Sequence, residues 1–271
     1  RRAVRQRTDR VIEVAGETRL GIAEFGDLTG RPIFAFHGSP SCRLNLTFVD
    51  DAARRHAVRV IAPDRWGIGL SPMADRQRLV TWADDVGALA GAMGIERFGV
   101  LGMSGGGPYA LACAARLPDR MGAGAVVSSS GPMGVPELQA VMSRTNRLWS
   151  TLSVRAPIVL GALLWGIGAY ARHWPEAFTR MVMARLPAPD RDALSRSGAC
   201  RAAYAPMTAE ALRTGSRGCV LDYRLQSLPW GFDPAEIPGP MHLWHGDEDL
   251  FVSPSHAEWL AVRIPNAIMH W

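Results

Sequence analysis

The chain has 271 residues, 48% of them hydrophobic, which suits one large α/β domain or a core with an inserted segment. All 30 basic residues are arginine, as a GC-rich bacterial genome would favour, so lysine Schiff bases, pyridoxal-phosphate anchors, Walker lysines and Ser–Lys dyads are excluded. Much of the net charge of +5 lies in N-terminal arginines that we expect to be frayed and solvated, so no nucleic-acid surface is expected. These are Arg1, Arg2, Arg5, Arg7 and Arg10.

The cysteine pattern indicates a reducing compartment. Cys42, Cys113, Cys200 and Cys219 show no C-x-x-C spacing, so they predict neither a metal nor a redox motif. No secretory signal is visible, and we expect a cytoplasmic protein. The charge-free run over residues 156–171 is short for a membrane span and suits a buried or cap helix, so stable membrane insertion is not expected.

Apolar strands alternate with helices through the first half of the chain. This alternation predicts a largely parallel sheet covered on both faces. In chain order we expect a hairpin of strands 11–14 and 19–25, strands 32–36 and 56–62, helix 82–93, strand 97–101, helix 108–117 and strand 122–127.

Helical patterns dominate the next part of the chain, from about 133 to 226, before the strand pattern resumes. We expect a strand over 240–244, a helix over 254–264 and a last strand from about 267. The sequence therefore predicts an α/β core formed by residues 1–132 and 232–271. A helical cap over residues 133–231 interrupts this core.

The most informative motif is Gly102-Met103-Ser104-Gly105-Gly106, which fits G-x-S-x-G between a predicted strand and a predicted helix. Such a turn holds its serine in a strained conformation, and the close approach of strand and helix requires small residues such as Gly102 and Gly106. Ser104 then lies at a helix N-terminus, where the Gly105 N–H can point at a developing oxyanion. The pattern predicts a nucleophilic serine.

Two further strand ends carry polar residues that complete a candidate site, because ligands of open α/β sheets bind beyond the carboxyl ends of the strands. Ser39 is placed to offer a second backbone N–H beside that of Gly105. His37 is a possible base, but we favour a structural histidine that braces the oxyanion loop. After the strand over 240–244, Asp249 is the first candidate for orienting a catalytic histidine, and Asp247 is the second.

Taken together, these motifs resemble the α/β-hydrolase superfamily over nearly the whole chain, in its serine-nucleophile, cap-bearing branch of esterases and aminopeptidases. The resemblance implies an α/β-hydrolase fold, with Ser104 as the nucleophile, Asp249 as the acid, and Ser39 and Gly105 as oxyanion donors. It also implies that Asp64 and Arg65 shape the adjacent loop. The motifs that carry it are His37-Gly38-Ser39-Pro40, residues 64–71 (DRWGIGLS), Gly102 to Pro108, and Gly246-Asp247-Glu248-Asp249.

The catalytic histidine is the one part of the pattern without a clear match. The resemblance places it in a loop after the last strand, and we expect it beyond Trp271, with His270 as the candidate inside the chain. We expect His256 to face solvent from its helix. His242 and His245 lie in and at the end of a strand, and we interpret them as structural.

The first functional hypothesis is a hydrolase of enzyme class 3 that cleaves a carboxylic ester or related acyl bond through an acyl-enzyme on Ser104. It needs no metal or organic cofactor, and its partner is a small apolar ester or amide. Trp149, Trp165 and Trp174 suggest an apolar pocket in the cap, although aromatic stripes also form cores.

Other hypotheses stay open. The same triad could serve a carbon–carbon hydrolase, a lactonase, a cofactor-free perhydrolase or a proline-iminopeptidase-like aminopeptidase. The aminopeptidase would need cap carboxylates, for which Glu137, Glu176 and Glu210 are present. A non-catalytic small-molecule binding protein of this fold is a second class, and a membrane-surface protein that uses residues 156–171 is a third.

Overall fold

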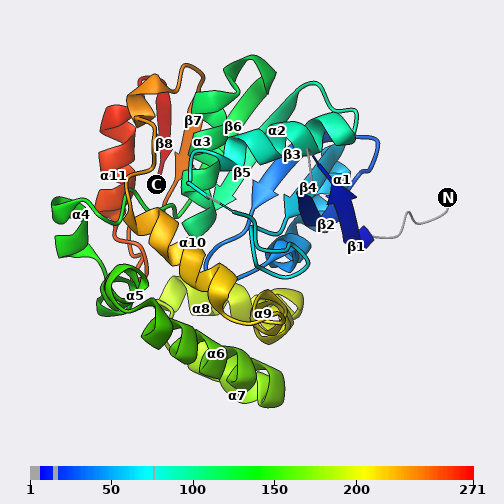
Figure 1. Ribbon diagram of the computed structural model, residues 1–271. Coiled ribbons are helices and arrows are strands. Elements are labelled where there is room, and N and C mark those ends of the chain that lie inside the picture. Colours follow the sequence, from blue (N-terminus) through cyan, green and yellow to red (C-terminus); the bar gives the residue numbers. More distant parts are fainter. Residues whose placement is uncertain (1–6, 15–17, 76) are drawn as a thin grey trace.

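The computed structural model describes residues 7–14, 18–75 and 77–271, and Figure 1 shows a twisted sheet with helices on both faces. The sheet has eight strands in the order β1-β2-β4-β3-β5-β6-β7-β8. β1 pairs with β2, and β2 with β4, in antiparallel orientation, and all later neighbours are parallel. The strands are β1 (Arg7–Glu13), β2 (Arg19–Gly26), β3 (Arg31–Phe36), β4 (Val58–Pro63), β5 (Phe98–Met103), β6 (Met121–Val127), β7 (Met241–Trp244) and β8 (Ala267–His270).

Helices α1, α2, α3 and α11 pack against this sheet, and Figure 1 shows α11 beside β8. The core between α2 and the sheet contains a cluster of edge-to-face aromatic rings. Trp82 is fully buried, and its ring lies 5.1 Å from that of Trp66 and 5.9 Å from those of Phe36 and Tyr109. The bounds of these helices are α1 (Asp50–Arg55), α2 (Trp82–Ala92), α3 (Gly107–Arg116) and α11 (Pro254–Arg263).

Between β6 and β7 the chain forms a segment made of helices, which we call the helical segment (residues 136–227). Serine side chains begin two of its helices: Ser143 accepts from the Asn146 N–H at 3.3 Å, and Ser197 from the Cys200 N–H at 3.3 Å. Its elements are α4 (Pro136–Val141), α5 (Arg144–Arg155), α6 (Pro157–His173), α7 (Pro175–Met183), α8 (Ala188–Arg196), α9 (Gly198–Ala211) and α10 (Arg217–Ser227).

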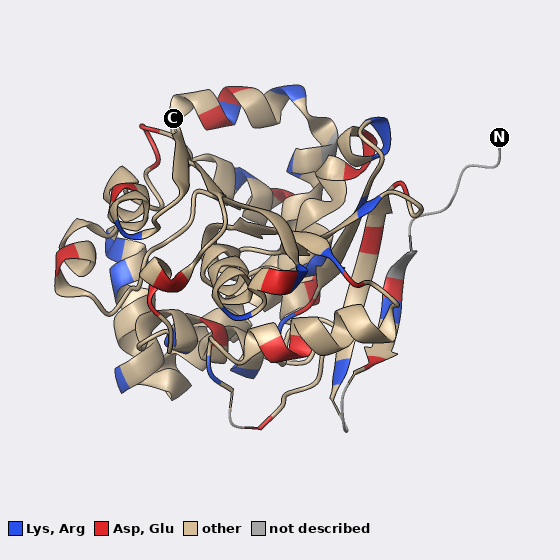
Figure 2. Ribbon diagram, turned by 90° about the horizontal axis from the view of Figure 1, so that it is seen from above, with Lys and Arg blue, Asp and Glu red and all other residues tan. Residues whose placement is uncertain are grey.

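The strands predicted from the sequence are found with bounds that differ by a few residues. The expectation of a frayed tail is wrong for residues 7–10, which belong to β1, and residues 1–6 lie outside the described part of the chain. The Arg10 guanidinium donates to the buried Glu24 carboxylate at 2.5 Å, and Arg59 donates to it at 2.6 Å. Figure 2 shows basic and acidic residues interspersed along the ribbon in that view.

The expectation that His256 faces solvent is also wrong. This histidine is buried on α11, and its Nδ1 accepts a hydrogen bond from the Gly131 N–H at 3.0 Å. Burial and the nearby His245 lower the pKa of His256 to about 4. The face of α11 that carries His256 packs against the loop after β6. This burial keeps the imidazole ring neutral near pH 7.

The buried His256 predicts a loss of stability in mild acid. Below pH 6.5 the unfolded chain takes up a proton on this ring, and the folded chain does so only near pH 4. The free energy of unfolding should therefore fall by about 3 kcal/mol for this residue as pH drops from 6.5 to 4. Urea titrations at several pH values should show a shallower pH slope for His256→Asn. The exposed-site control His56→Asn should keep the wild-type slope, and an unchanged slope in His256→Asn would contradict the assignment.

Candidate active site

Ser104 lies on the sharp turn between β5 and α3. Its φ of +50° is in the left-handed region, which costs a non-glycine residue about 1–3 kcal/mol. The neighbouring glycines have no space for a side chain: a Cβ on Gly102 would lie 2.6 Å from the Gly107 Cα, and one on Gly106 would lie 2.2 Å from the Phe36 carbonyl oxygen. The turn therefore has the strained backbone and close packing that its motif predicts.

The loop after β3 meets this turn because β3 and β5 are neighbours in the sheet. A Cβ on Gly38 would touch the Ser104 Cβ at 3.4 Å, and a Cβ on Gly105 would lie 2.3 Å from the Ser39 Oγ. The fold thus brings Ser39, Gly105 and Ser104 together at the carboxyl edge of the sheet.

A buried ion pair lies directly behind the Ser39 loop. The Arg65 guanidinium makes a bidentate contact with Asp222, with Nε–Oδ1 and Nη2–Oδ2 distances of 2.8 Å. The same guanidinium donates to the carbonyl oxygens of His37 at 2.6 Å and of Gly38 at 3.1 Å. Arg65 therefore ties the backbone of this loop to α10, which carries Asp222.

Asp222 accepts two further hydrogen bonds. The hydroxyl of Ser39 donates to it, and the hydroxyl of Tyr109 donates to it at 2.7 Å. Burial raises the pKa of Asp222, but the charge and hydrogen bonds of Arg65 outweigh this effect, so the pKa lies below its ordinary value. The carboxylate is thus held ionised. The role of Asp222 could not be predicted from the sequence, because its partners Arg65, Ser39 and Tyr109 are far away along the chain.

The contacts of His37 agree with a structural residue. The ring is completely buried, with its Nδ1 at 2.8 Å from the Gly38 carbonyl oxygen and its Nε2 at 3.4 Å from the Arg65 N–H. Burial and the charge of Arg65 lower the pKa of His37 to about 3, which keeps the imidazole neutral.

Asp249 lies in the loop after β7 and faces the same cavity as Ser104. Its Oδ1 accepts from the backbone N–H groups of Phe251 at 2.8 Å and Val252 at 3.0 Å, which fixes the carboxylate. Its Oδ2 lies 3.6 Å from the Nε2 of the buried His245. The second candidate, Asp247, is exposed and does not line the cavity.

The cavity between the sheet edge and the helical segment has a volume of about 400 Å³. Its sheet side carries the polar candidates Ser39, Ser104 and Asp249. Its other side is mostly apolar and comes from α6, α7, α9 and the turn after α7. The apolar residues of that side are Ile167, Phe178, Val182, Leu186 and Met207.

The three tryptophans predicted to form an apolar pocket do not line this cavity, so that expectation is wrong. Trp165 and Trp174 are exposed, and the ring of Trp149 stacks on that of Tyr223 at 6.2 Å. Composition alone could not tell an outward tryptophan from an inward one.

The carboxylates suggested for binding a substrate amine also lie elsewhere. Glu137 accepts from the Trp259 indole at 3.4 Å, Glu176 is exposed, and Glu210 pairs with Arg43 at 2.8 Å. The carboxylate from the helical segment that lines the cavity is instead Asp190 of α8. Burial and the charge of Asp249 raise the pKa of Asp190.

His270 lies on β8, and its ring packs against side chains of β7. Its Nε2 is 2.9 Å from the Nδ1 of His242, and its ring stacks on that of Trp244 at 4.0 Å. His270 is not among the residues that line the Ser104 cavity. The structure therefore brings together Ser104, Ser39, Gly105 and Asp249, and holds His270 apart from that cavity.

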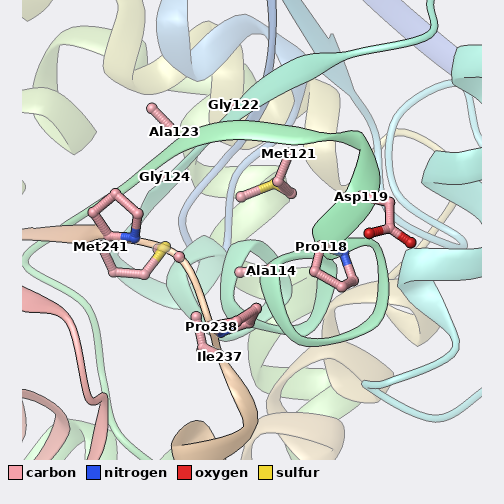
Figure 3. Close-up of a pocket in the computed structure, with 12 residues that line it drawn as sticks. Ala114, Pro118, Asp119, Met121, Gly122, Ala123, Gly124, Ile237, Pro238 and Met241 are labelled. Atoms are coloured by element: carbon pink, nitrogen blue, oxygen red, sulfur yellow. The ribbon is translucent and has the colours of Figure 1, made fainter.

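A second pocket lies at the opposite edge of the sheet, where β6 and β7 begin, and has a volume of about 290 Å³ (Figure 3). It is lined by residues such as Pro118, Met121, Pro238 and Met241, with no serine, cysteine or histidine. This pocket lacks the groups that acyl transfer needs. Among the described residues, no three His, Cys, Asp or Glu side chains gather as metal ligands would, and all four cysteines are free thiols.

Comparison with known proteins assigns residues 31–270 to the alpha/beta hydrolase fold family, so the chain belongs to that family. Similar solved structures include an alpha/beta hydrolase fold protein from Nakamurella multipartita, at 22% identity and a TM-score of 0.63, covering 96% of this chain and 89% of the other. The esterase RhEst1 from Rhodococcus sp. ECU1013 matches at 21% identity and a TM-score of 0.65, covering 97% and 90%. The enol-lactonase from Burkholderia xenovorans LB400 matches at 20% identity and a TM-score of 0.66, covering 96% and 90%.

At these identities the structural matches show the fold, and the predicted α/β-hydrolase fold is confirmed. No sequence among curated proteins matches the chain.

Proposed function

We propose that the protein is a serine hydrolase that cleaves a carboxylic ester or related acyl bond. The observation that carries this proposal is the left-handed Ser104, which faces the cavity with Ser39 and Asp249 around it. A nucleophile needs a base, an oriented partner for that base and donors for the oxyanion. The candidate site offers the nucleophile, the donors and the carboxylate.

In the proposed reaction the Ser104 Oγ attacks the substrate carbonyl while a histidine takes the hydroxyl proton. The backbone N–H groups of Ser39 and Gly105 receive the developing oxyanion, and the N-terminus of α3 favours the negative charge. The histidine then protonates the leaving alcohol, and an ester joins the acyl group to Ser104. Water, activated by the same histidine, hydrolyses this ester and restores the serine.

We propose that the base is a histidine in the residues that follow β8. The carbonyl oxygen of His270 accepts from the His245 N–H at 3.0 Å, and the Trp271 ring lies 6.2 Å from that of His245. The chain therefore leaves β8 beside the loop that holds Asp249, where a histidine could reach the Asp249 carboxylate. His270, the candidate inside the chain, would first have to give up its contacts with β7.

We further propose that the helical segment belongs to a cap that extends over residues 133–231, and that its apolar side of the cavity receives the acyl chain. Phe178, Val182 and Leu186 can bury such a chain, because apolar area removed from water favours binding by about 25 cal/mol per Å². The names of two similar structures, an esterase and an enol-lactonase, support cleavage of an ester bond. Hydrolysis of p-nitrophenyl butyrate, compared between wild type and Ser104→Ala, tests the proposal.

The position of Asp190 favours a second candidate, an aminopeptidase that uses the same nucleophile. Its carboxylate lies in the cavity wall opposite the sheet, where it could pair with the ammonium group of a peptide N-terminus. Esters with uncharged acyl groups have no such group, so the two candidates differ in what they require of this side chain.

The variant Asp190→Asn separates these candidates. For an aminopeptidase we expect kcat/KM for an aminoacyl p-nitroanilide to fall about tenfold or more, with little change for p-nitrophenyl butyrate. For an esterase we expect the hydrolysis of p-nitrophenyl butyrate to stay within about twofold of wild type. Turnover of the aminoacyl p-nitroanilide should then be absent. Glu176→Gln, which alters an exposed carboxylate outside the cavity, is the matched control.

A further inference from the structure

Helix α6 has an outer face that is apolar, although it points to water. Residues 156–169 contain no charged side chain, and the Trp165 indole is their only hydrogen-bonding side-chain group, so this part of the helix lacks the polar stripe that a surface helix normally presents. Ile158 is 86% exposed, and Trp165, two turns later in the same row, is 66% exposed. Val159 and Leu163 form the neighbouring row, at 51% and 43% exposure. We call these four residues the apolar strip. Figure 1 shows α6 at the outer edge of the helical segment, away from the sheet.

The opposite side of α6 already has its partners. Leu160 and Leu164 are fully buried against residues of α9 and α10, and Ile167 lines the Ser104 cavity. The apolar strip is therefore distinct from the face of α6 that packs into the protein core. Four large apolar side chains that stay in water form a patch of the kind that marks an interaction surface.

The charges around the strip select its partner. Residues 138–175 contain no Asp or Glu, but they contain four arginines. Arg155 precedes the first turn of α6 and Arg172 lies in its last turn. Both are exposed, so positive charge lies beyond each end of the apolar strip, with about 25 Å of helix between the two arginines. Exposed apolar side chains with an arginine beyond each end can contact acyl chains and anionic headgroups at the same time.

We propose that the apolar strip docks on the surface of an anionic lipid bilayer. In the docked state α6 lies parallel to the surface, with Ile158 and Trp165 among the acyl chains and Arg155 and Arg172 among the lipid phosphates. No helix in the described ranges is both long and apolar enough to pass through a bilayer, and α6 has 17 residues, so surface docking is the geometry this helix can adopt.

A second copy of the chain suits the strip less well. A symmetric dimer would place the same face on both subunits and bring the arginines at its ends toward one another. The stretch from 138 to 175 supplies no carboxylate to neutralise them. A lipid phosphate does neutralise them, and it leaves the apolar strip in contact with acyl chains.

The test is co-sedimentation of the intact chain with vesicles of phosphatidylcholine alone and of phosphatidylcholine mixed with phosphatidylglycerol. We expect binding at low salt to the mixed vesicles and at least about tenfold weaker binding to the neutral ones. Ile158→Asp should weaken binding to the mixed vesicles at least about tenfold, and Trp165→Ser should also weaken it. Val262→Asp is the matched control, because Val262 is 83% exposed on α11, well away from α6 (Figure 1), and its binding should equal that of wild type.

Three outcomes would overturn the proposal: no binding to mixed vesicles at low salt, equal binding by wild type and Ile158→Asp, or equal binding to both vesicle types. A wild-type dimer that Ile158→Asp converts to a monomer in sedimentation would assign the strip to a second copy instead. Because α6 is exposed here, circular dichroism of Ile158→Asp should match that of wild type. The readout does not depend on catalysis by Ser104, so this proposal and the hydrolase proposal can fail separately.

Discussion

Replacing Ser104 with alanine is expected to lower kcat/KM for p-nitrophenyl butyrate by about 10³-fold or more, because alanine has no oxygen to form the acyl-enzyme. The loss should lie in kcat, since the apolar side of the cavity is untouched. The fold should persist, because alanine and serine share the same backbone and only one hydroxyl is removed. Steady-state kinetics and a urea titration of the same samples check both parts.

Two controls accompany this measurement: replacement of a serine outside the cavity, and a comparison that tests where the catalytic base lies. Ser195→Ala alters a serine of α8 whose hydroxyl donates to the Asp192 carbonyl oxygen at 2.8 Å, and it should keep wild-type kinetics. The measurement should be made on the 271-residue chain and on the gene product extended downstream of it. Activity only in the longer protein, unchanged by His270→Gln, would support a base after β8. Activity that survives in Ser104→Ala would contradict the mechanism.

Replacing Asp222 with alanine is expected to lower the free energy of unfolding by about 3–5 kcal/mol. The change would leave the buried Arg65 guanidinium without its bidentate partner, and an uncompensated buried charge is costly. The hydroxyls of Ser39 and Tyr109 would lose an acceptor at the same time. Chemical denaturation at neutral pH measures the loss.

The matched control is an ion pair on the surface. Glu176 and Arg180 lie 3.9 Å apart and are both largely exposed, so Glu176→Ala should leave the free energy of unfolding unchanged within error. The isosteric Asp222→Asn should be milder than Asp222→Ala, and it should lower kcat more than it changes KM, because it loosens the Ser39 loop rather than the substrate pocket. Equal stability of Asp222→Ala and wild type would contradict the account of this network.

The strands and the Ser104 turn could be predicted because their signals are local. Gly102 is required by a contact within the strand–turn–helix unit, Gly106 by a contact with the adjacent strand β3, and both glycines belong to the local motif that also gives Ser104 its left-handed φ. The positions of Ser39 and Asp249 could be predicted as well, since both follow strands whose carboxyl ends meet at one edge of the sheet.

The other contributions to the site depend on how helices α5 to α10 are oriented against the sheet. The sequences of these helices do not determine that orientation. Asp190 and Asp222 acquire their surroundings only when the helical segment packs on the sheet. Trp165 is exposed rather than in the predicted pocket, because residues 157–169 of α6 carry no charged side chain that would set the orientation of the helix. The burial of His256 could not be predicted either, because the loop after β6 that covers it is distant in the sequence.

The most direct test of the central claim is covalent labelling of the protein, extended through the residues that follow β8, with a fluorophosphonate probe, read by peptide mass spectrometry. The probe phosphonylates a serine only where that serine is activated as a nucleophile. The account predicts one adduct, on the peptide that contains Ser104, and no adduct in Ser104→Ala. An adduct on a different residue, or hydrolysis of p-nitrophenyl butyrate by wild type with Ser104 unlabelled, would contradict it.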